Sequence, residues 1–415
     1  MLESLLKNWR DLLNMKYLEK KAHAYALKNA VSYNGKAQIG AVLSALFHEG
    51  LKKEDVKKFI KDINKIVSEV NKLSLEEQER EFENLKKEVD EREVREGLPE
   101  LPNAKKGVIM RFRPSPSGPL HIGHIISNMI SSLYVEKYGG KFYVIIDDTS
   151  PDTALPEAYR NIKKDCDWIF GNVCKYINSS DRMNLYYKYA ETLIKKGAVY
   201  VCTCSAEKFK EFAELKESCP CRNNDLKENL YRWKKMLSKD KKNQFNEGKA
   251  VLRFKSNMKH PNPAIRDFPL ARINEKVHPL QKKKYRVWPL MNLAVSVDDI
   301  ELKMSHIIRG KDHRDNAERQ KMIFKALGKK YPWTFFMGRI KFKDLILSKR
   351  KLDAAIKSGE FSGAEDEKLP TIASLRKRGY NPEVFKKFVI QRGLTEVDKV
   401  LDSKEFFKTL ESFDK

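Results

Sequence analysis

Two histidines of this chain are placed where a protein can hold an anion. His121 and His124 close the segment Pro114–His124 (PSPSGPLHIGH), which follows a short apolar run. On the first turn of a helix, residues three apart share one face, and the backbone N–H groups there already favour negative charge. Gly123 lies between them without a side chain, so a flat base could approach the backbone. We predict a site for a phosphate-bearing nucleotide; the alternative is that the histidines only cap or pack the helix.

Four cysteines form a second group with chemical potential. They occur as Cys202-Thr-Cys204 and Cys219-Pro-Cys221, with 14 residues between the pairs. Zn²⁺ in structural sites takes four soft ligands at tetrahedral corners, and two closely spaced pairs can supply them. The alternative is four unrelated free thiols. We predict a structural zinc site formed by these four cysteines.

The composition narrows the class of partner. The chain has 415 residues, and 82 Lys and Arg against 57 Asp and Glu give a net charge of +25. Such an excess is typical of proteins that meet a polyanion, either nucleic acid or an anionic membrane surface, although an ordinary basic cytosolic protein can also carry it. The chain has no run of 18 apolar residues, and its start has no signal-peptide core. We predict a cytoplasmic protein that binds nucleic acid and no membrane.

The elements that must position the histidines are a strand, a helix and a second strand. The patterns predict a strand at Gly107–Arg113, a loop at Pro114–Leu120, a helix at His121–Tyr138 and a strand at Lys141–Asp147. Such a βαβ unit implies a parallel sheet with a right-handed crossover. Ligands of these sheets bind beyond the carboxyl ends of the strands. We therefore predict an α/β fold with its chemistry in the first loop.

The rest of the chain differs from this unit in its pattern of polar and apolar residues. A polar helical region precedes it, with a capping box at Ser74–Glu77. A segment from Cys202 to about Asn292 looks inserted, because the sheet pattern resumes only after it. Further predicted elements are helices at 55–70, from 74 to about Glu96 and at Tyr231–Lys242, a final strand at Lys341–Leu347, and short basic helices beyond it.

Two motifs resemble the signatures of class I aminoacyl-tRNA synthetases. His121–His124 (HIGH) follows a strand, and Lys349 in Leu347–Arg350 (LSKR) is similar to the second lysine of the KMSKS loop. The wider sequence resembles glutamyl-tRNA synthetases of the archaeal/eukaryotic type, which share ancestry with the glutaminyl enzymes. The other resembling segments are Arg111–His124, Asp147–Thr149, Ser180–Met183, Asn262–Asp267, Arg309–His313, Lys36–Gly40 and Leu73–Gln78.

This resemblance implies a division into four parts. A Rossmann-type catalytic domain would occupy residues 106–200 and 293–350, and an inserted acceptor-stem-binding domain with a zinc knuckle residues 201–292. An N-terminal helical region would occupy residues 1–105, and a C-terminal helical connector residues 351–415. The anticodon-reading β-barrels of the family would be absent, so the chain would be a fragment, a shortened form, or one whose barrels lie on another polypeptide.

The resemblance also implies the reaction of a glutamate–tRNA ligase. Glutamate would attack ATP, with Mg²⁺, to give glutamyl-adenylate and pyrophosphate, and the glutamyl group would pass to the 3′-terminal adenosine of tRNA(Glu). His121, His124 and Lys349 would be catalytic, since positioning and charge stabilisation dominate such chemistry. The implied ATP-binding residues are Pro114, Ser115, Gly118, His121, Gly123, His124, Ser348 and Lys349. The expected tRNA contacts are Lys282, Lys283 and Lys284.

The amino acid site departs from the pattern of the resembling family. The implied glutamate-binding residues are Arg111, Ser115, Asp147 and Arg309. Asp147 stands where many members have glutamate, Arg113 where a small alanine is usual, and Ile145 where an arginine is usual. In one interpretation, which we favour, Asp147 still pairs the α-ammonium group and glutamate remains the substrate. In the other, the pocket takes a different acidic amino acid or is degraded.

Two other functions stay open on the sequence alone. A shortened paralogue could aminoacylate a modified tRNA base or another carrier, and a catalytically idle tRNA-binding protein could derive from a synthetase. His121, His124 and Lys349 argue against the idle protein, because a pure binding module has no use for them. The N-terminal helices could dock a separate anticodon-binding polypeptide or a multi-synthetase partner.

Overall fold

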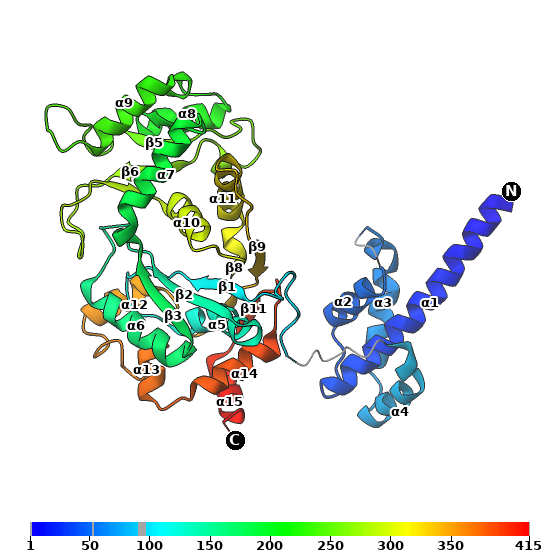
Figure 1. The fold of residues 1–415 in the computed structure, drawn as a ribbon. Helices are drawn as coiled ribbons and strands as arrows, with labels where there is room; N and C mark the ends of the chain where they lie inside the picture. Colours follow the sequence, from blue (N-terminus) through cyan, green and yellow to red (C-terminus); the bar gives the residue numbers. More distant parts are fainter. Residues whose placement is uncertain (1, 52–53, 90–96, 415) are drawn as a thin grey trace. The chain divides into compact units, whose positions relative to one another are not determined.

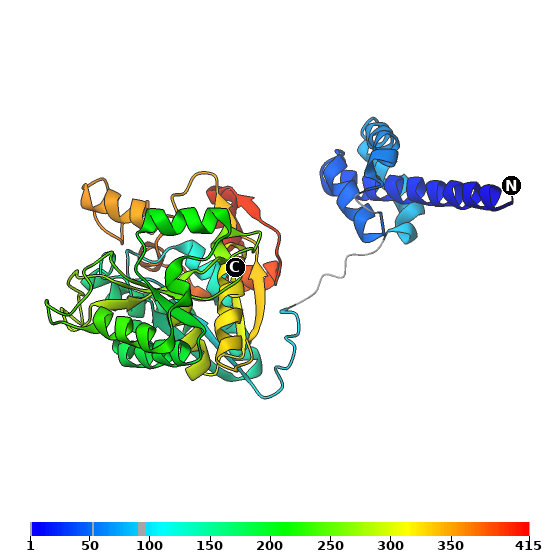
Figure 2. The ribbon, with the colours of Figure 1, turned by 90° about the horizontal axis from the view of Figure 1, so that it is seen from above.

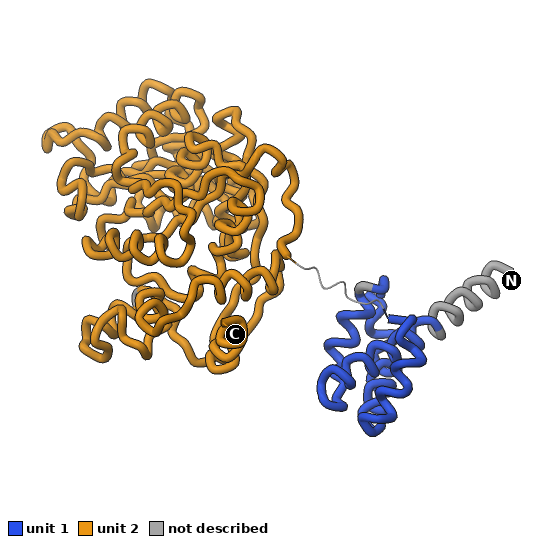
Figure 3. The backbone as a smooth tube through the Cα atoms, turned by 60° about the horizontal axis from the view of Figure 1, so that its bottom comes forward, with its two compact units in different colours: residues 1–94 blue, residues 95–415 orange. Residues whose placement is uncertain are grey.

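The computed structural model of the chain describes residues 2–51, 54–89 and 97–414. They belong to two compact units, Met1–Val94 and Arg95–Lys415, which Figure 3 colours separately. Within the described residues, no helix has both the length and the apolar character that crossing a membrane requires.

The first unit is helical, as the sequence predicts. Its helices are α1 (Leu2–Ser32), α2 (Ile39–His48), α3 (Val56–Val70) and α4 (Leu75–Leu85), followed by a 3₁₀ turn at Lys86–Glu88. The predicted capping box begins α4: Ser74 accepts a hydrogen bond from the Glu77 N–H, and the Glu77 carboxylate accepts one from the Ser74 N–H. The prediction that this helix continues to Glu96 is wrong, because the chain is extended at Val89. Residues 90–96 lie outside the described part.

The second unit is built on a parallel sheet that confirms the predicted βαβ unit. Its strands are β1 (Val108–Phe112), β2 (Gly140–Ile146) and β3 (Val173–Asn178), connected by α5 (Ile122–Tyr138) and α6 (Pro156–Phe170) (Figure 1). The strands follow the order β1-β2-β3, and α5 packs its apolar residues on them in one core. The crossover ends at Gly140, where φ is +128° and a Cβ atom would meet the Val108 carbonyl oxygen at 2.0 Å. Only glycine can start β2 this close to β1.

A second parallel pair lies against β1. It consists of β8 (His306–Gly310) and β9 (Trp333–Met337), connected by a 3₁₀ turn (Lys311–His313) and α11 (Arg314–Ala326). Just before β8, the Ser305 N–H donates to the Ile109 carbonyl, and the Ser305 hydroxyl accepts the Ile109 N–H. The carboxyl ends of β1, β2 and β8 consequently line one cavity.

The segment between the two parallel sheets carries an antiparallel sheet of its own. Its strands are β4 (Val199–Cys202), β5 (Val251–Phe254), β6 (Pro269–Ile273) and β7 (Val287–Pro289), in that order. The helices of this part are α7 (Met183–Lys195), α8 (Ala206–Leu215), α9 (Leu226–Leu237) and α10 (Met291–Glu301). The sequence pattern predicts this helix at Tyr231–Lys242, whereas α9 begins and ends five residues earlier; Asp225 caps its start through the Glu228 N–H. The predicted domain boundaries at residues 201 and 292 remain predictions.

The C-terminal part covers the loop that precedes α5. Its elements are β10 (Ile340–Phe342), α12 (Lys349–Lys357), α13 (Ile372–Lys377), α14 (Pro382–Arg392), β11 (Lys399–Leu401) and α15 (Ser403–Ser412). The predicted strand at Lys341–Leu347 is mostly wrong: only β10 forms, and it pairs with β11, seen beside it in Figure 2. The Ile122 N–H donates to the Pro370 carbonyl and the Ile372 N–H to the Leu120 carbonyl. The connector thereby fixes the start of α5 from outside.

Candidate active site

A cavity of about 370 Å³ opens where β1, β2 and β8 end. Its walls also include the first turns of α5, the start of α10 and the turn between β9 and β10. The predicted site residues that line it are Arg111, Gly123, His124, Asp147 and Arg309. The predicted residues that do not line it are Pro114, Ser115, Gly118, His121, Ser348, Lys349, Lys282, Lys283 and Lys284. Of these, His121 packs directly on a wall residue, and Lys349 contacts the adjoining loop.

The two histidines adopt a defined arrangement at the N-terminus of α5. The His121 backbone N–H donates to Nδ1 of His124 at 3.1 Å, and the two ring centroids are 3.9 Å apart. Burial and the Lys349 charge lower the pKa of His121 to about 4, and burial and His121 lower the pKa of His124 well below its usual range. Both rings are therefore neutral near pH 7. Because Nδ1 of His124 accepts, its Nε2 carries the proton and is a donor.

Gly123 has a packing role that the sequence did not predict. A Cβ atom at this position would lie 3.1 Å from the His121 ring and 3.4 Å from the Leu347 side chain. The glycine therefore lets the imidazole and Leu347 fold over the start of α5, in addition to lining the cavity. Its predicted role in admitting a base remains a prediction.

Lys349 reaches back to the loop between β1 and α5. Its Nζ donates to the Ser115 carbonyl at 2.7 Å, and a Cβ atom on Gly118, where φ is +140°, would lie 3.2 Å from the Lys349 carbonyl oxygen. Burial lowers the pKa of this ammonium group to about 8. The segment thus places Lys349 beside Ser115 and Gly118; their predicted common role in binding ATP remains a prediction. No ionic partner within 4.0 Å neutralises it among the described residues.

Arg111 and Arg113 are both neutralised by acids from α10. Arg111 makes a bidentate pair with Asp299, whose carboxylate receives Nε at 2.5 Å and Nη2 at 2.8 Å. Arg113 donates to Asp298 at 2.6 Å, to Asp147 at 3.1 Å and to the Ser179 hydroxyl at 2.9 Å. Burial disfavours the charge of Arg113, but Asp147 and Asp298 outweigh it and raise its pKa. Arg111 is therefore part of a structural ion pair, and its predicted role in binding glutamate remains a prediction.

Asp298 and Asp299 are functional-site residues that sequence reasoning missed. Both are buried, and Asp298 also accepts from Arg182 and from the Tyr186 hydroxyl. A signal was available: two adjacent acids end the otherwise apolar run Leu293–Asp299 (LAVSVDD). Acids on a buried helix need partners, so this pattern indicates cations nearby.

Arg309 is the guanidinium group of this cluster that lacks an acid. Its Nη1 donates to the Gln320 side-chain oxygen at 2.8 Å, and among the described residues no carboxylate lies within 4.0 Å of it. Burial and the neighbouring Arg111 charge lower its pKa. A carboxylate entering the cavity would relieve both effects. Arg309 is thus chemically suited to receive an anionic group; its predicted role in binding glutamate remains a prediction.

Asp147 is held in place by two donors. Arg113 binds one of its oxygens, and the Thr149 hydroxyl donates to the other at 2.9 Å. Burial opposes its charge, but Arg113 and Thr149 outweigh burial and lower its pKa. The carboxylate is therefore ionised and keeps free lone pairs toward the cavity that it lines. Such a group can accept a substrate ammonium.

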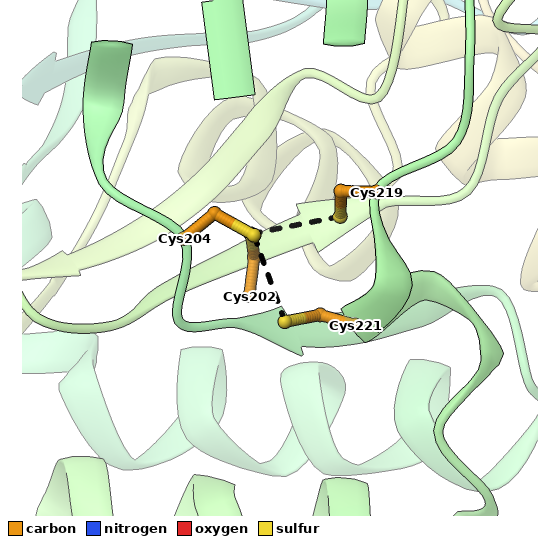
Figure 4. A group of neighbouring side chains, drawn as sticks. All are labelled: Cys202, Cys204, Cys219 and Cys221. Atoms are coloured by element: carbon orange, nitrogen blue, oxygen red, sulfur yellow. Dashed lines mark hydrogen bonds between the residues drawn. The ribbon is translucent and has the colours of Figure 1, made fainter. Parts of the chain in front are cut away.

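The four predicted zinc ligands come together. Figure 4 shows the sulfurs of Cys202, Cys204, Cys219 and Cys221 pointing toward one another from β4, the chain beyond it and the turn before α9. All four lie within 4.8 Å of one another, and the Cys202–Cys219 and Cys204–Cys221 sulfurs are 3.8 and 3.9 Å apart. A tetrahedral ion with Zn–S bonds of about 2.3 Å needs sulfurs about 3.8 Å apart. The cluster therefore fits a zinc ion.

We expect the purified protein to carry about one zinc ion per chain and to lose it on Cys204→Ser, because three thiolates leave one tetrahedral corner open. Metal content measured by inductively coupled plasma mass spectrometry checks this. Cys174→Ser, which removes an exposed cysteine outside the cluster, is the matched control and should keep the metal. Metal-free parent protein with normal folding would refute the site.

The three predicted tRNA-contacting lysines lie in the connection between β6 and β7. Lys282, Lys283 and Lys284 are all exposed, so their ammonium groups can reach a partner. A second cavity of about 1020 Å³ lies between α8, β6 and α11, and its lining contains Lys210, Lys216, Arg253, Arg266 and Arg319 against one acid, Glu214. Met291 lines both cavities. The second cavity thus borders the first.

Comparison with known proteins supports the resemblance to the class I tRNA synthetases. A family model described as tRNA synthetases class I (E and Q), catalytic domain, matches residues 107–414. The glutamate–tRNA ligase of Methanocaldococcus jannaschii is 41% identical over 382 residues, covering 92% of this chain and 68% of the relative. The glutamate–tRNA ligase of Thermococcus onnurineus is 41% identical over 389 residues, covering 91% of this chain and 67% of the relative.

A solved structure supports the fold alone. The glutamate–tRNA synthetase of Elizabethkingia anophelis superposes with a TM-score of 0.52 at 18% identity, covering 74% of this chain and 70% of that chain. The family match extends over most of the second unit, including the histidines, the LSKR loop and the cysteine cluster. The chain belongs to the class I tRNA synthetases of the glutamate and glutamine (E and Q) type.

Proposed function

We propose that the chain is a glutamate–tRNA ligase, which activates glutamate with ATP and transfers it to tRNA(Glu). The observation that carries the proposal is the cavity itself: a neutral His124 donor and an acid-free Arg309 line the same space, and Asp147 supplies a fixed carboxylate. Arg309 without an acid partner, the ionised Asp147 and the neutral donor of His124 suit an acidic amino acid beside a nucleotide. The curated relatives of the chain bear the same activity in their names.

In the first step, an oxygen of the α-carboxylate of glutamate attacks the α-phosphorus of ATP. A new P–O bond forms, the bond to the β-phosphate bridging oxygen breaks, and pyrophosphate leaves with its electron pair. His121 and His124 would hold the triphosphate, and Lys349 would pair with the leaving side, where negative charge accumulates. Mg²⁺, when bound to the phosphates, shares in neutralising that charge. Ser348, Gly118 and Pro114 would shape the loops on either side.

The amino acid would be fixed by charges of both signs. Arg309 would receive a carboxylate of glutamate, and Asp147 would accept from its α-ammonium group. Arg111 and Arg113 are already paired with Asp299 and Asp298, so they would hold the wall of the pocket in place rather than offer the substrate a free fork. Ser115 would contribute its hydroxyl. Because Asp147 remains ionised, we propose that it still pairs the α-ammonium group, although many family members have glutamate at this position, and that glutamate remains the substrate.

In the second step, the 2′-hydroxyl of the terminal adenosine of tRNA attacks the adenylate carbonyl, and AMP leaves. The cationic second cavity would hold the single-stranded 3′ end, since it borders the first cavity at Met291. Lys282, Lys283 and Lys284 would contact the backbone of the acceptor stem, in the part that we propose to be the acceptor-binding domain. The zinc ion would fix the knuckle beside it. Reduced thiols of this kind suit the cytoplasm, where we place the reaction.

Amino-acid-dependent ATP–pyrophosphate exchange, run with each of the twenty amino acids with and without tRNA, tests the proposal. We expect exchange with glutamate and none above background with aspartate or glutamine, because Arg309 would pair with a side-chain carboxylate that glutamine lacks and that aspartate holds one methylene closer to its backbone. Exchange with glutamate without charging of tRNA would favour the paralogue with another acceptor. Silence under all conditions would favour the idle binding protein. The predicted separate anticodon-binding or multi-synthetase partner has no support among the relatives, and we do not propose one.

A further inference from the structure

The connection between β6 and β7 carries the three lysines. It is also held by polar contacts to the loops that follow β2 and β3. The Asn274 amide donates to Asp152 at 2.6 Å, and the Lys276 ammonium lies 2.7 Å from the same carboxylate. On the other side, the Gln281 amide donates to Asp181 at 2.7 Å. Asp152 follows β2 and Asp181 follows β3. The connection therefore spans the ends of two strands of the catalytic sheet.

His278 is the buried centre of this connection. Its side chain is fully buried and stacks on Trp288, with ring centroids 4.9 Å apart at an interplanar angle of 22°. Nδ1 accepts the backbone N–H groups of Leu280 and Gln281 at 3.1 Å each, so the ring proton is on Nε2. Nε2 then donates to the backbone carbonyl of Asp148 at 2.9 Å. One ring nitrogen thus holds the turn of His278 itself, and the other holds Asp148, the residue next to Asp147.

Asp148 is fixed through its side chain too. Its carboxylate accepts from the Ser180 N–H and hydroxyl at 2.7 Å each and from the Tyr159 hydroxyl at 3.0 Å. The residues that precede this fixed pair in the chain, Asp147 and Ser179, are both acceptors of Arg113. The His278 hydrogen bond therefore influences the positions of Asp147 and Ser179, which both accept hydrogen bonds from the Arg113 guanidinium group.

We propose that His278 is a positioning residue for the amino acid. It holds the Asp147–Asp148 turn in register with Arg113, so that the inserted connection forms part of the support of the substrate pocket. The proposal rests on the proposed function, in which Asp147 receives the substrate ammonium group. Misplacement of a substrate-positioning group by about 1 Å can cost on the order of 10²-fold in catalytic efficiency. Among the described residues, the hydrogen bonds and the ring contact of His278 go to Asp148, Leu280, Gln281, Lys282 and Trp288 and not to the loops around His121 and Lys349, so we expect ATP binding to depend on it little.

A matched pair of substitutions separates this role from a purely structural one. In His278→Asn, the side-chain oxygen replaces Nδ1 as acceptor for the turn, but no donor reaches Asp148. In His278→Gln, the longer amide replaces Nε2 as donor to the Asp148 carbonyl, but the acceptor for the turn is lost. Both variants lose the stacked ring equally. If His278 only held its own turn, Asn would be the better replacement; as a positioning residue, Gln is the better one.

The measurement is ATP–pyrophosphate exchange with saturating tRNA, with separate KM values for glutamate and ATP. We expect His278→Asn to raise KM for glutamate about tenfold and to leave KM for ATP within about twofold, because one buried carbonyl loses its donor. His278→Gln should stay within about threefold of the parent for both. Val277→Ala, which changes a neighbouring side chain that is 54% exposed, is the control for local damage and should match the parent.

The opposite order of Asn and Gln, or an equal change in both KM values, would overturn the proposal. Thermal unfolding of each variant reports damage to the fold separately, and a KM change that simply follows the loss of Tm would count as structural. The parent protein tests the proposed function in the same assay. If it exchanges with glutamate and the variants fail to show the split, only the role of His278 falls; if the parent shows no exchange, both fall.

Discussion

Lys349→Ala is expected to slow formation of the aminoacyl adenylate by roughly 10²–10³-fold, the size of effect that one lost charge-stabilising donor has at a transition state. The ammonium group is poised for this role, because it lies half-buried against the Ser115 carbonyl with no acid to neutralise it. When pyrophosphate leaves, the Lys349 ammonium group would exchange its contact with the Ser115 carbonyl for an ionic contact with the pyrophosphate. Pre-steady-state formation of adenylate, measured by rapid quench in the presence of tRNA, gives the rate directly.

Lys351→Ala is the matched control, since Lys351 is an exposed lysine two residues further along α12. Its adenylate rate should stay within about twofold of the parent, because an exposed cation away from the phosphates adds little. An unchanged rate in Lys349→Ala would show that the charge on the leaving group is stabilised by another loop.

The pKa of Lys349 supplies a second readout of the same substitution. Burial lowers this pKa to about 8 in the free protein, whereas a bound triphosphate favours the charged lysine. Below pH 8 the lysine is charged and binding needs no proton; above pH 8 binding must take one up. KM for ATP in the parent should therefore rise as pH increases beyond 8. Lys349→Ala should lack this rise.

Much of the structure around His121 could be predicted from local sequence patterns. The strand, loop and helix around His121 are determined by apolar runs and by the paired glycines at Gly139 and Gly140, and the helix differs by one residue from its predicted start. The capping box at Ser74 and the cysteine pairs are likewise local signals. Each depends on residues close together in the chain, which is why a single sequence suffices.

Partners brought together by tertiary structure could not be predicted in this way. Arg111 and Asp299 are 188 residues apart, and Arg113 and Asp298 are 185 apart. Nothing in the local sequence of either arginine indicates which acid it will meet. The short strand β10 shows the same limit, because it pairs with a strand nearly sixty residues further along the chain. Pairing, rather than propensity, decides such elements.

Arg113→Ala should destabilise the second unit by about 3–5 kcal/mol, the cost of removing one partner from a buried ion pair. Its guanidinium group serves Asp298, Asp147 and Ser179 at once. After the substitution, Asp298 keeps Arg182 and Tyr186, but Asp147 keeps only Thr149. Equilibrium unfolding in urea measures the loss, and Arg160→Ala, at an exposed position, should change stability by no more than about 0.5 kcal/mol.

The unpaired charge is the physical cause, and a double variant tests it. Adding Asp147→Asn to Arg113→Ala removes the carboxylate charge that lost its only cationic partner among the described residues, so the double variant should be more stable than the sum of the single changes predicts. A coupling energy of about 1 kcal/mol or more is expected for residues in direct contact. Simple additivity would contradict the ion-pair explanation and point to lost packing.

A second double variant, with a change in the neighbouring strand, tests whether Arg113 takes over the role of the arginine that the resembling family usually has at the position of Ile145. Phe112 pairs with Val144, so Arg113 lies beside Ile145, on the sheet face toward Tyr143 and Met304. The resembling family usually has alanine and arginine at these two places, so the chain carries the guanidinium group on the other strand of the same pair. Arg113→Ala with Ile145→Arg should therefore regain at least part of the lost stability and of glutamate-dependent exchange. If it is no better than Arg113→Ala alone, Arg113 is not a relocated form of the usual arginine but a change in what the pocket accepts.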